Sequence, residues 1–226
     1  MSGNELIYAL DLMGTAGFAF SGALRGLQRR PDLIGVTILA GATAVGGGMV
    51  RDVVLQRPVT MLWDVNYLIV ILLAAMVTFL FPRALADRES FFKYFDAVGL
   101  GIFSAIGAGI AWQIGERSGG LGWTDGINPI SILFIAAITG AGSGVIRDVL
   151  ITRMPLVLYK EIYILAVLVG AGGLIVVRAT GGTEVAGFLA AMFLTIAIRV
   201  LAIRYNWSLP RVRFGLGKGV AGPEKD

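Results

Sequence analysis

The sequence contains no cysteine and no histidine, and only 15% of its residues are charged. The absence of cysteine excludes disulfide bonds, thiolate metal sites and cysteine nucleophiles. The absence of histidine removes the commonest general base and the commonest metal ligand in proteins. An enzyme of this composition would have to rely on carboxylates, so we predict no enzymatic activity, no metal site and no cofactor.

Hydrophobic residues make up 56% of the 226 residues, and the mean hydropathy is +0.79. A soluble domain is normally about 45–50% apolar and about 25% charged. The charges here lie between long apolar runs, which is typical of an all-α polytopic membrane protein. The net charge of +4 favours positive loops at an anionic lipid surface. No basic stripe or run of stacking aromatics indicates nucleic acid.

Seven apolar segments qualify as membrane-spanning helices, which need about 20 residues to cross the hydrocarbon core. They are Leu6–Leu24, Leu33–Leu55, Val65–Phe81, Tyr94–Ile114, Ile130–Ile151, Ile162–Val177 and Val185–Ile203. No basic residue precedes the first segment, so we interpret it as a retained span and not a cleaved signal. The short connections predict a single transmembrane domain over residues 1–205, followed by a basic cytoplasmic tail over residues 206–226.

The first three segments resemble the next three. Matching residues in the first and fourth segments are Asp11, Gly14 and Phe18 with Asp96, Gly99 and Phe103. Further along, Gly46, Gly48, Arg51, Asp52, Arg57 and Tyr67 match Gly142, Gly144, Arg147, Asp148, Arg153 and Tyr163. Because three crossings is an odd number, the second group enters the membrane from the opposite side. We therefore predict two inverted repeats, about 5–82 and 93–178, plus a seventh helix at about 184–204.

The distribution of Lys and Arg predicts the orientation. Fifteen of the 19 basic residues fall on the side that holds the C-terminal tail, and four fall on the other side. The positive-inside rule then places the C-terminus in the cytoplasm and the N-terminus outside.

Two glycine clusters lie near the middle of the second and fifth segments. They are Gly46, Gly47 and Gly48 in the second segment, and Gly140, Gly142 and Gly144 in the fifth. Each glycine costs a helix about 1 kcal/mol relative to alanine. The clusters therefore favour bends at the bilayer midplane, where opened backbone would form an ion or substrate site. Nearby hydroxyl groups come from Thr43, Thr139 and Ser143. The other interpretation is close helix packing through small residues.

An Arg-Asp pair follows each glycine cluster, at Arg51-Asp52 and at Arg147-Asp148. Inversion predicts one pair on the outer side of the midplane and the other on the cytoplasmic side, where they would act as pore charges or gates. The alternative is that these arginines are snorkelling anchors at the membrane interface. Adjacent helical residues do not face each other, so Arg51 need not pair with Asp52, and pairing across the repeats is also open.

Four further charged residues stand out. Lys160-Glu161 begins the sixth segment and is either part of a gate or an interfacial pair at a helix start. Asp11 and Asp96 lie early in their segments, so we interpret them as residues that cap or anchor a helix start near the interface.

The chain resembles the prokaryotic trimeric intracellular cation (TRIC) channel family. The resemblance rests on Asp11 to Gly14, Thr43 to Asp52, Gly142 to Asp148 and Pro155 to Tyr163, and it extends to about Arg204. Lys160-Glu161-Ile162 is similar to the family's Lys-Glu-Val motif. The resemblance implies seven helices, a homotrimer and, in each subunit, a pore for monovalent cations, chiefly potassium, lined by the second and fifth helices at their glycine kinks. Ala141 and Ser143 interrupt the second cluster, where the family has consecutive glycines.

We therefore expect a passive potassium channel in a prokaryotic inner membrane, with lipids, monovalent cations and two further copies of the chain as partners. Carbonyl and hydroxyl oxygens at the bends would replace part of the hydration shell of the ion. The alternative is a secondary transporter of a small polar solute, because inverted repeats with broken helices suit alternating access equally well.

Overall fold

A computed structural model describes residues 3–29, 31–82, 89–119, 122, 127–159 and 162–207 of the chain. The long helices within these residues coincide with the apolar segments. They are α1 (Gly3–Leu27), α2 (Leu33–Val54), α3 (Val65–Leu80), α5 (Glu89–Arg117), α6 (Pro129–Leu150), α8 (Ile162–Ala179) and α9 (Glu184–Arg204). Two short elements, η1 (Thr60–Leu62) and α7 (Leu156–Tyr159), follow α2 and α6.

Six of these helices are long and apolar enough to cross a membrane, and α3 is the exception. With 16 residues, α3 measures about 24 Å, less than the thickness of about 30 Å of a typical hydrocarbon core. The predicted third span therefore exists as an apolar helix but falls short of the usual length. Of the predicted tail, residues 206–226, only Asn206 and Trp207 are among the described residues.

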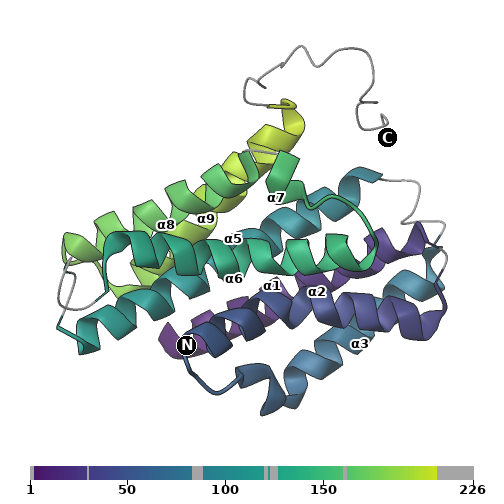
Figure 1. Ribbon diagram of the computed structural model, residues 1–226, viewed down its shortest axis with the longest axis horizontal. Helices are drawn as coiled ribbons and strands as arrows, with labels where there is room; N and C mark the ends of the chain where they lie inside the picture. Colours follow the sequence, from purple (N-terminus) through teal and green to yellow (C-terminus); the bar gives the residue numbers. More distant parts are fainter. Residues whose placement is uncertain are drawn as a thin grey trace, which may run out of the picture.

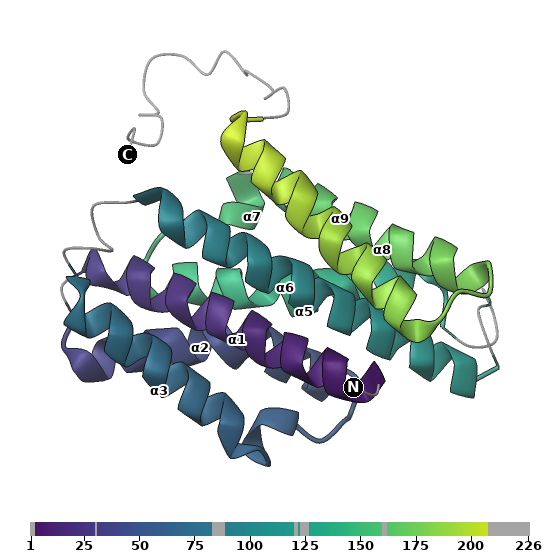
Figure 2. The same ribbon diagram turned by 180° about the vertical axis from the view of Figure 1, so that it is seen from behind.

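Helices α1 and α5 cross the middle of the molecule (Figure 1). Helix α3 packs against α1 and α2 at one edge, and α8 and α9 pack together at the opposite edge (Figure 2). This arrangement leaves α5 the most enclosed of the six long spans. The apolar face of α3, by contrast, carries many exposed leucine, isoleucine and valine side chains, as expected for a surface covered by lipid.

Contacts between helix ends establish the directions of the helices. The Tyr8 hydroxyl near the start of α1 donates to Asp64, which caps the start of α3. Gln113 near the end of α5 donates to Glu184 at the start of α9, with 2.6 Å between Nε2 and Oε1. Arg29, just after α1, donates to the main chain at the end of α6. A Cβ atom added at Gly3, the first residue of α1, would lie 3.0 Å from Val185 near the start of α9. Helices α1, α3, α6 and α9 therefore run in one direction and α5 runs in the other.

Helices α1 and α5 meet through two matched glycine–phenylalanine contacts. A Cβ atom added at Gly99 would lie 2.6 Å from the Phe18 ring, and one added at Gly14 would lie 2.9 Å from the Phe103 ring. The two rings pack edge to face with centroids 5.2 Å apart. The four residues are those that the repeat aligns, and the two glycines are required because no larger side chain fits between the helices.

Candidate functional site

The two glycine clusters bring α2 and α6 into direct contact. The Gly47 N–H donates to Ser143 Oγ at 3.0 Å, and the Cα of Gly47 lies 3.4 Å from the position of a Cβ on Gly142. A Cβ on Gly47 itself would lie only 2.1 Å from the Thr139 carbonyl oxygen. The glycines thus allow one helix backbone to touch the other.

The backbone stays helical through both glycine clusters, so no turn is opened there, while the predicted bend of each helix stays a prediction. Helix α2 is continuous from Leu33 to Val54, and α6 is continuous from Pro129 to Leu150. The alternative of close packing through small residues accounts for the clusters, because the contact of the two backbones offsets the low helix propensity of glycine. The Thr43 and Thr139 hydroxyls are buried and donate to Leu39 and Ile135 of their own helices, each at 2.6 Å.

The remaining glycines of the clusters face different neighbours. Gly46 faces Ile146 of α6, and Gly140 faces α5. Gly48 lies beside the Arg51 guanidinium, and Gly144 lies beside the Tyr163 hydroxyl. Each cluster is therefore adjacent to the Arg-Asp pair that follows it.

A polar cluster surrounds the Arg51-Asp52 pair, and we name it the outer cluster, and the one around Arg147 the inner cluster, after the sides that the orientation predicted from Lys and Arg gives them. Arg51 binds Asp52 through both Nε and Nη2, each 2.8 Å from Oδ1. Asp52 also accepts from the Thr60 N–H at 3.4 Å. Asp11, a half-buried residue of α1, accepts from the Tyr67 hydroxyl of α3 at 2.6 Å.

A cavity of about 30 Å³ lies inside this outer cluster. It is lined by both carboxylates, Asp11 and Asp52, by Arg51, and by the hydroxyl-bearing residues Thr15 and Tyr67. The volume holds about two waters. Two carboxylates against one guanidinium leave the cavity with an excess of negative charge when all three are ionised.

An inner polar cluster surrounds Arg147 in the same way but is sealed. The Arg147 side chain has no exposed surface. Its Nε donates to Asp148 at 2.9 Å, and its Nη1 donates to Ser21 at 2.7 Å and to Asp96. Asp148 accepts in addition from the Leu156 N–H at 3.0 Å. Two carboxylates from α5 and α6 thus bind one buried arginine.

Aromatic rings and two more arginines close the inner cluster. The guanidinium carbons of Arg25 and Arg147 lie 4.4 and 5.8 Å from the centroid of the Phe92 ring. Arg199 of α9 lies 4.5 Å from the centroid of the Tyr163 ring. Three atoms in this cluster are buried without a hydrogen-bond partner among the described residues: Asp96 Oδ2, Arg147 Nη2 and Tyr163 Oη.

Comparisons with known proteins agree with this architecture. A family model described as a glycine transporter matches residues 8–83 and 93–179. The UPF0126 inner membrane protein YadS of Escherichia coli K12 is 36% identical over 215 residues, which cover 91% of this chain and 95% of YadS.

Two solved structures share the fold over nearly the whole chain. One comes from work on the structural basis for conductance through TRIC cation channels. Its sequence is 31% identical to this chain, its TM-score is 0.81, and the match covers 92% of this chain and 98% of the solved one. A TRIC trimeric intracellular cation channel orthologue from Rhodobacter sphaeroides is 30% identical with a TM-score of 0.79, covering 89% and 99%. The chain belongs to the prokaryotic TRIC channel family. The solved relatives of this TRIC-family chain are channels rather than enzymes, and YadS is a membrane protein.

The structure decides two points that the sequence left open about the charged residues of this TRIC-family chain, and it corrects one prediction. Arg51 and Arg147 each pair with the aspartate next to them, because the long guanidinium can fold back along the helix surface. Both arginines are buried, 6% and 0% exposed, so they are not snorkelling anchors at the interface. Asp96 is neither a cap nor an interface anchor, because it is fully buried and bound to Arg147.

Some residues of the two clusters were not predicted from the sequence. Arg25, Phe92 and Arg199 come from parts of α1, α5 and α9 that carry no motif. For Asp11, Asp96, Tyr67 and Tyr163, the sequence did offer one signal: Asp11 aligns with Asp96 and Tyr67 aligns with Tyr163, as the two Arg-Asp pairs align with each other. Lys160 and Glu161 lie outside the described residues.

Proposed function

We propose that this TRIC-family chain conducts monovalent cations, chiefly potassium, by passive flow through a pore within each subunit of a homotrimer. The solved relatives are named as cation channels, one of them as trimeric. In this proposal, helices α2 and α6 line the pore, and the chain forms two inverted repeats plus a seventh helix.

The outer cavity is the observation that carries the proposal. Asp11 and Asp52 attract a cation, while Thr15, Tyr67 and the carboxylates supply the oxygen atoms that replace part of its hydration shell. Arg51 holds Asp52 in place and limits the net charge, so that a cation binds weakly enough to leave again.

The path leads from the outer cavity past the contact of Gly47 with Ser143 to the inner cluster. There the buried Arg147 and its two aspartates close it. In this proposal, conduction requires Arg147 to separate from Asp96 and water to enter, and the pore is closed at its inner half while the pair is intact. The two matched clusters at opposite ends of the α2–α6 contact support the inverted repeat.

The orientation in the prokaryotic inner membrane follows from the distribution of basic residues, with the N-terminus outside and the C-terminal tail in the cytoplasm. The absence of cysteine allows a clean test with single cysteines introduced at Asp64 and at Thr152. A membrane-impermeant thiol reagent added to intact cells should label the first and spare the second. The reverse pattern would overturn the orientation.

Recording from the purified protein in planar bilayers under a potassium gradient tests the channel. We expect unitary currents far faster than carrier turnover, reversing near the potassium equilibrium potential. Asp11→Asn should reduce conductance, because it removes a charge of the outer cavity, whereas Glu5→Gln on the same helix should leave conductance unchanged. Silent bilayers in the presence of folded protein would refute the channel.

A second candidate function is secondary transport of a small polar solute such as glycine. The match to a family model described as a glycine transporter over both halves of the chain favours it. Counterflow of labelled glycine in proteoliposomes distinguishes the two: saturable exchange without unitary currents would favour the transporter.

A further inference from the structure

A cavity of about 60 Å³ lies where α5 and α8 begin and α9 ends. Two cationic side chains line it, Lys93 from α5 and Arg199 from α9. Apolar side chains such as Leu156 and Ile203 form the rest of its wall, and none of the described residues that line it is acidic. Within the described residues, the cavity therefore carries two positive charges and no negative charge.

Arg199 is buried without a carboxylate partner. The residue is 5% exposed, and its guanidinium stacks on the Tyr163 ring. Its Nε is enclosed and has no hydrogen-bond partner in the part of the chain that the structure describes. The two Nη atoms make no hydrogen bond there either, but they are not enclosed, so they are the atoms that open onto the cavity. A buried cation without an anion is costly, and stacking on one ring offsets only part of that cost.

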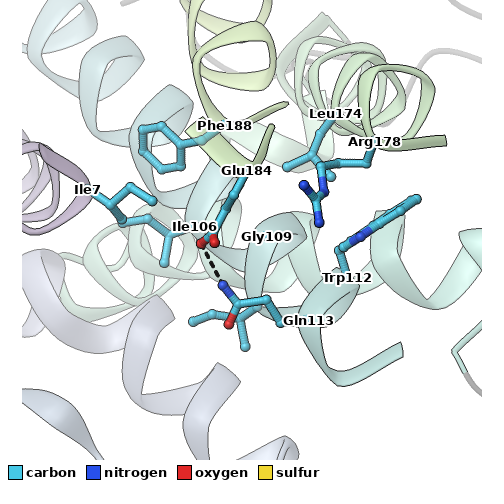
Figure 3. Close-up of a pocket in the computed structure, with 10 residues that line it drawn as sticks. Ile7, Ile106, Gly109, Trp112, Gln113, Leu174, Arg178, Glu184 and Phe188 are labelled. Atoms are coloured by element: carbon cyan, nitrogen blue, oxygen red, sulfur yellow. Dashed lines mark hydrogen bonds between the residues drawn. The ribbon is translucent and has the colours of Figure 1, made fainter. Parts of the chain in front are cut away.

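Other arginines of this fold have the partner that Arg199 lacks. Arg51 and Arg147 each bind an aspartate. The same three helices, α5, α8 and α9, enclose a second cavity at their opposite ends, and Arg178 faces it (Figure 3). Arg178 is paired with Glu116, with 2.6 Å between Nη2 and Oε1. The unpaired guanidinium is thus a specific feature of the cavity at Arg199.

The rest of the cavity supplies further donors. Lys93 is half-buried and forms no ion pair within the described ranges. Asn206 adopts a left-handed conformation with φ of 53°, which asparagine tolerates better than most residues. The Trp207 N–H donates to the Ala202 carbonyl at 3.0 Å, so the chain turns back across the end of α9. This turn brings the amide of Asn206 to the cavity.

The size and charge of the cavity indicate the class of ligand. A volume of about 60 Å³ holds about four waters, which is also the space that the four oxygens of a phosphate group require. Guanidinium and ammonium groups are the side chains that proteins use most to bind phosphate oxygens.

We propose that this cavity binds a phosphate group, whose oxygens accept from the Arg199 Nη atoms, the Lys93 ammonium group and the Asn206 amide. In the predicted orientation the cavity faces the cytoplasmic side of the membrane. The phosphate is therefore either free in the cytoplasm or the headgroup of an anionic lipid. The site is separate from the outer cavity and does not depend on the proposed conduction of cations.

Trp207 also lines the cavity and reports on it directly. In the full-length protein, Trp63, Trp112 and Trp123 are replaced with phenylalanine so that Trp207 is the single tryptophan. Inorganic phosphate is titrated into the protein in a neutral detergent, with potassium chloride keeping the ionic strength constant. The Trp207 fluorescence should change saturably with phosphate and stay constant when chloride alone is added.

Two variants test the location. Arg199→Gln and Lys93→Gln should each weaken phosphate binding about ten-fold or more, because each removes a charge-assisted hydrogen bond. Arg204→Gln is the matched control: it removes the same charge from the same helix as Arg199, but Arg204 is exposed and does not line the cavity. Melting temperatures without phosphate establish that each variant is folded, and the half-buried Lys93 keeps the test valid if Arg199→Gln does not fold.

Two arms identify the source of the phosphate. Saturation by inorganic phosphate, without any effect of phosphatidylglycerol in mixed micelles, assigns a free phosphate. Saturation by phosphatidylglycerol but not by phosphatidylcholine, weakened by the same two variants, assigns a lipid headgroup. No saturable change with either probe, binding that both variants leave unchanged, or equal weakening by Arg204→Gln would overturn the site.

Discussion

Replacing Gly47 with alanine tests whether direct contact of α2 and α6 holds the two halves together. The added Cβ would lie 2.1 Å from the Thr139 carbonyl oxygen and 2.9 Å from Ser143 Oγ. Ordinary contacts begin at 3.4 Å, so the two helices would have to separate by more than 1 Å at this level.

The expected cost is a balance of two effects. Overpacking of a closely packed contact costs about 1–3 kcal/mol, and sometimes more. Alanine in place of glycine within a helix recovers about 1 kcal/mol. The hydrogen bond from the Gly47 N–H to Ser143 weakens as the helices part, which costs about 1 kcal/mol more. We therefore expect a net loss of about 1–3 kcal/mol.

Thermal unfolding in detergent measures this loss. For a chain of this size, about 1 kcal/mol corresponds to about 2–4 °C, so Gly47→Ala should lower the melting temperature by about 2–12 °C. Gly172→Ala is the control: its Cβ would meet no neighbour within 4 Å, so the gain in helix propensity should raise the melting temperature slightly. A Gly47→Ala protein as stable as the wild type would refute the contact.

Three further changes probe the charged groups. Asp96→Asn should destabilise the fold by about 1.5–3 kcal/mol, because it removes one charge-assisted hydrogen bond of the buried Arg147, which keeps Asp148 as its charged partner. A loss no larger than that of Asp11→Asn, measured by thermal unfolding, would show that the inner cluster is hydrated. If the Arg147–Asp96 pair closes the pore, Asp96→Glu should raise the open probability in bilayer recordings, and unchanged gating would remove the pair from the gate. The hydrogen bond from Tyr8 lowers the pKa of the Asp64 carboxyl, so the ionised carboxylate stabilises the fold above the unfolded pKa of about 3.9, and this stabilisation disappears as the pH falls through the lower folded pKa. The difference in melting temperature between wild type and Asp64→Asn should therefore shrink from pH 6 to pH 3. A difference that grows over this range would contradict the lowered pKa of Asp64.

Much of the architecture could be predicted because lipid imposes strong constraints on sequence. A helix satisfies its own backbone in an apolar solvent, so long apolar runs become helices at nearly the predicted positions. The membrane class and the TRIC family followed from these runs and from motifs such as Thr43 to Asp52. The third segment was the exception, because apolar composition predicts a helix but not whether it is long enough to cross.

The glycine clusters show where prediction from sequence stops. Three consecutive glycines are compatible with a broken helix and with close packing, and the choice depends on what lies opposite. Here Ser143 and the Thr139 carbonyl lie opposite Gly47, so the helix remains intact and touches its partner.

The sequence by itself determined the helices, the matching residues of the two halves and the positions of the two Arg-Asp pairs, because each depends on local composition and spacing. Only the tertiary structure decided that Arg147 is sealed between Asp96 and Asp148 while Asp11 and Asp52 share a cavity. The matching residues make the two clusters chemically alike. The inner cluster also contains the buried Arg25, Phe92 and Arg199, which come from separate helices and meet only when the chain folds.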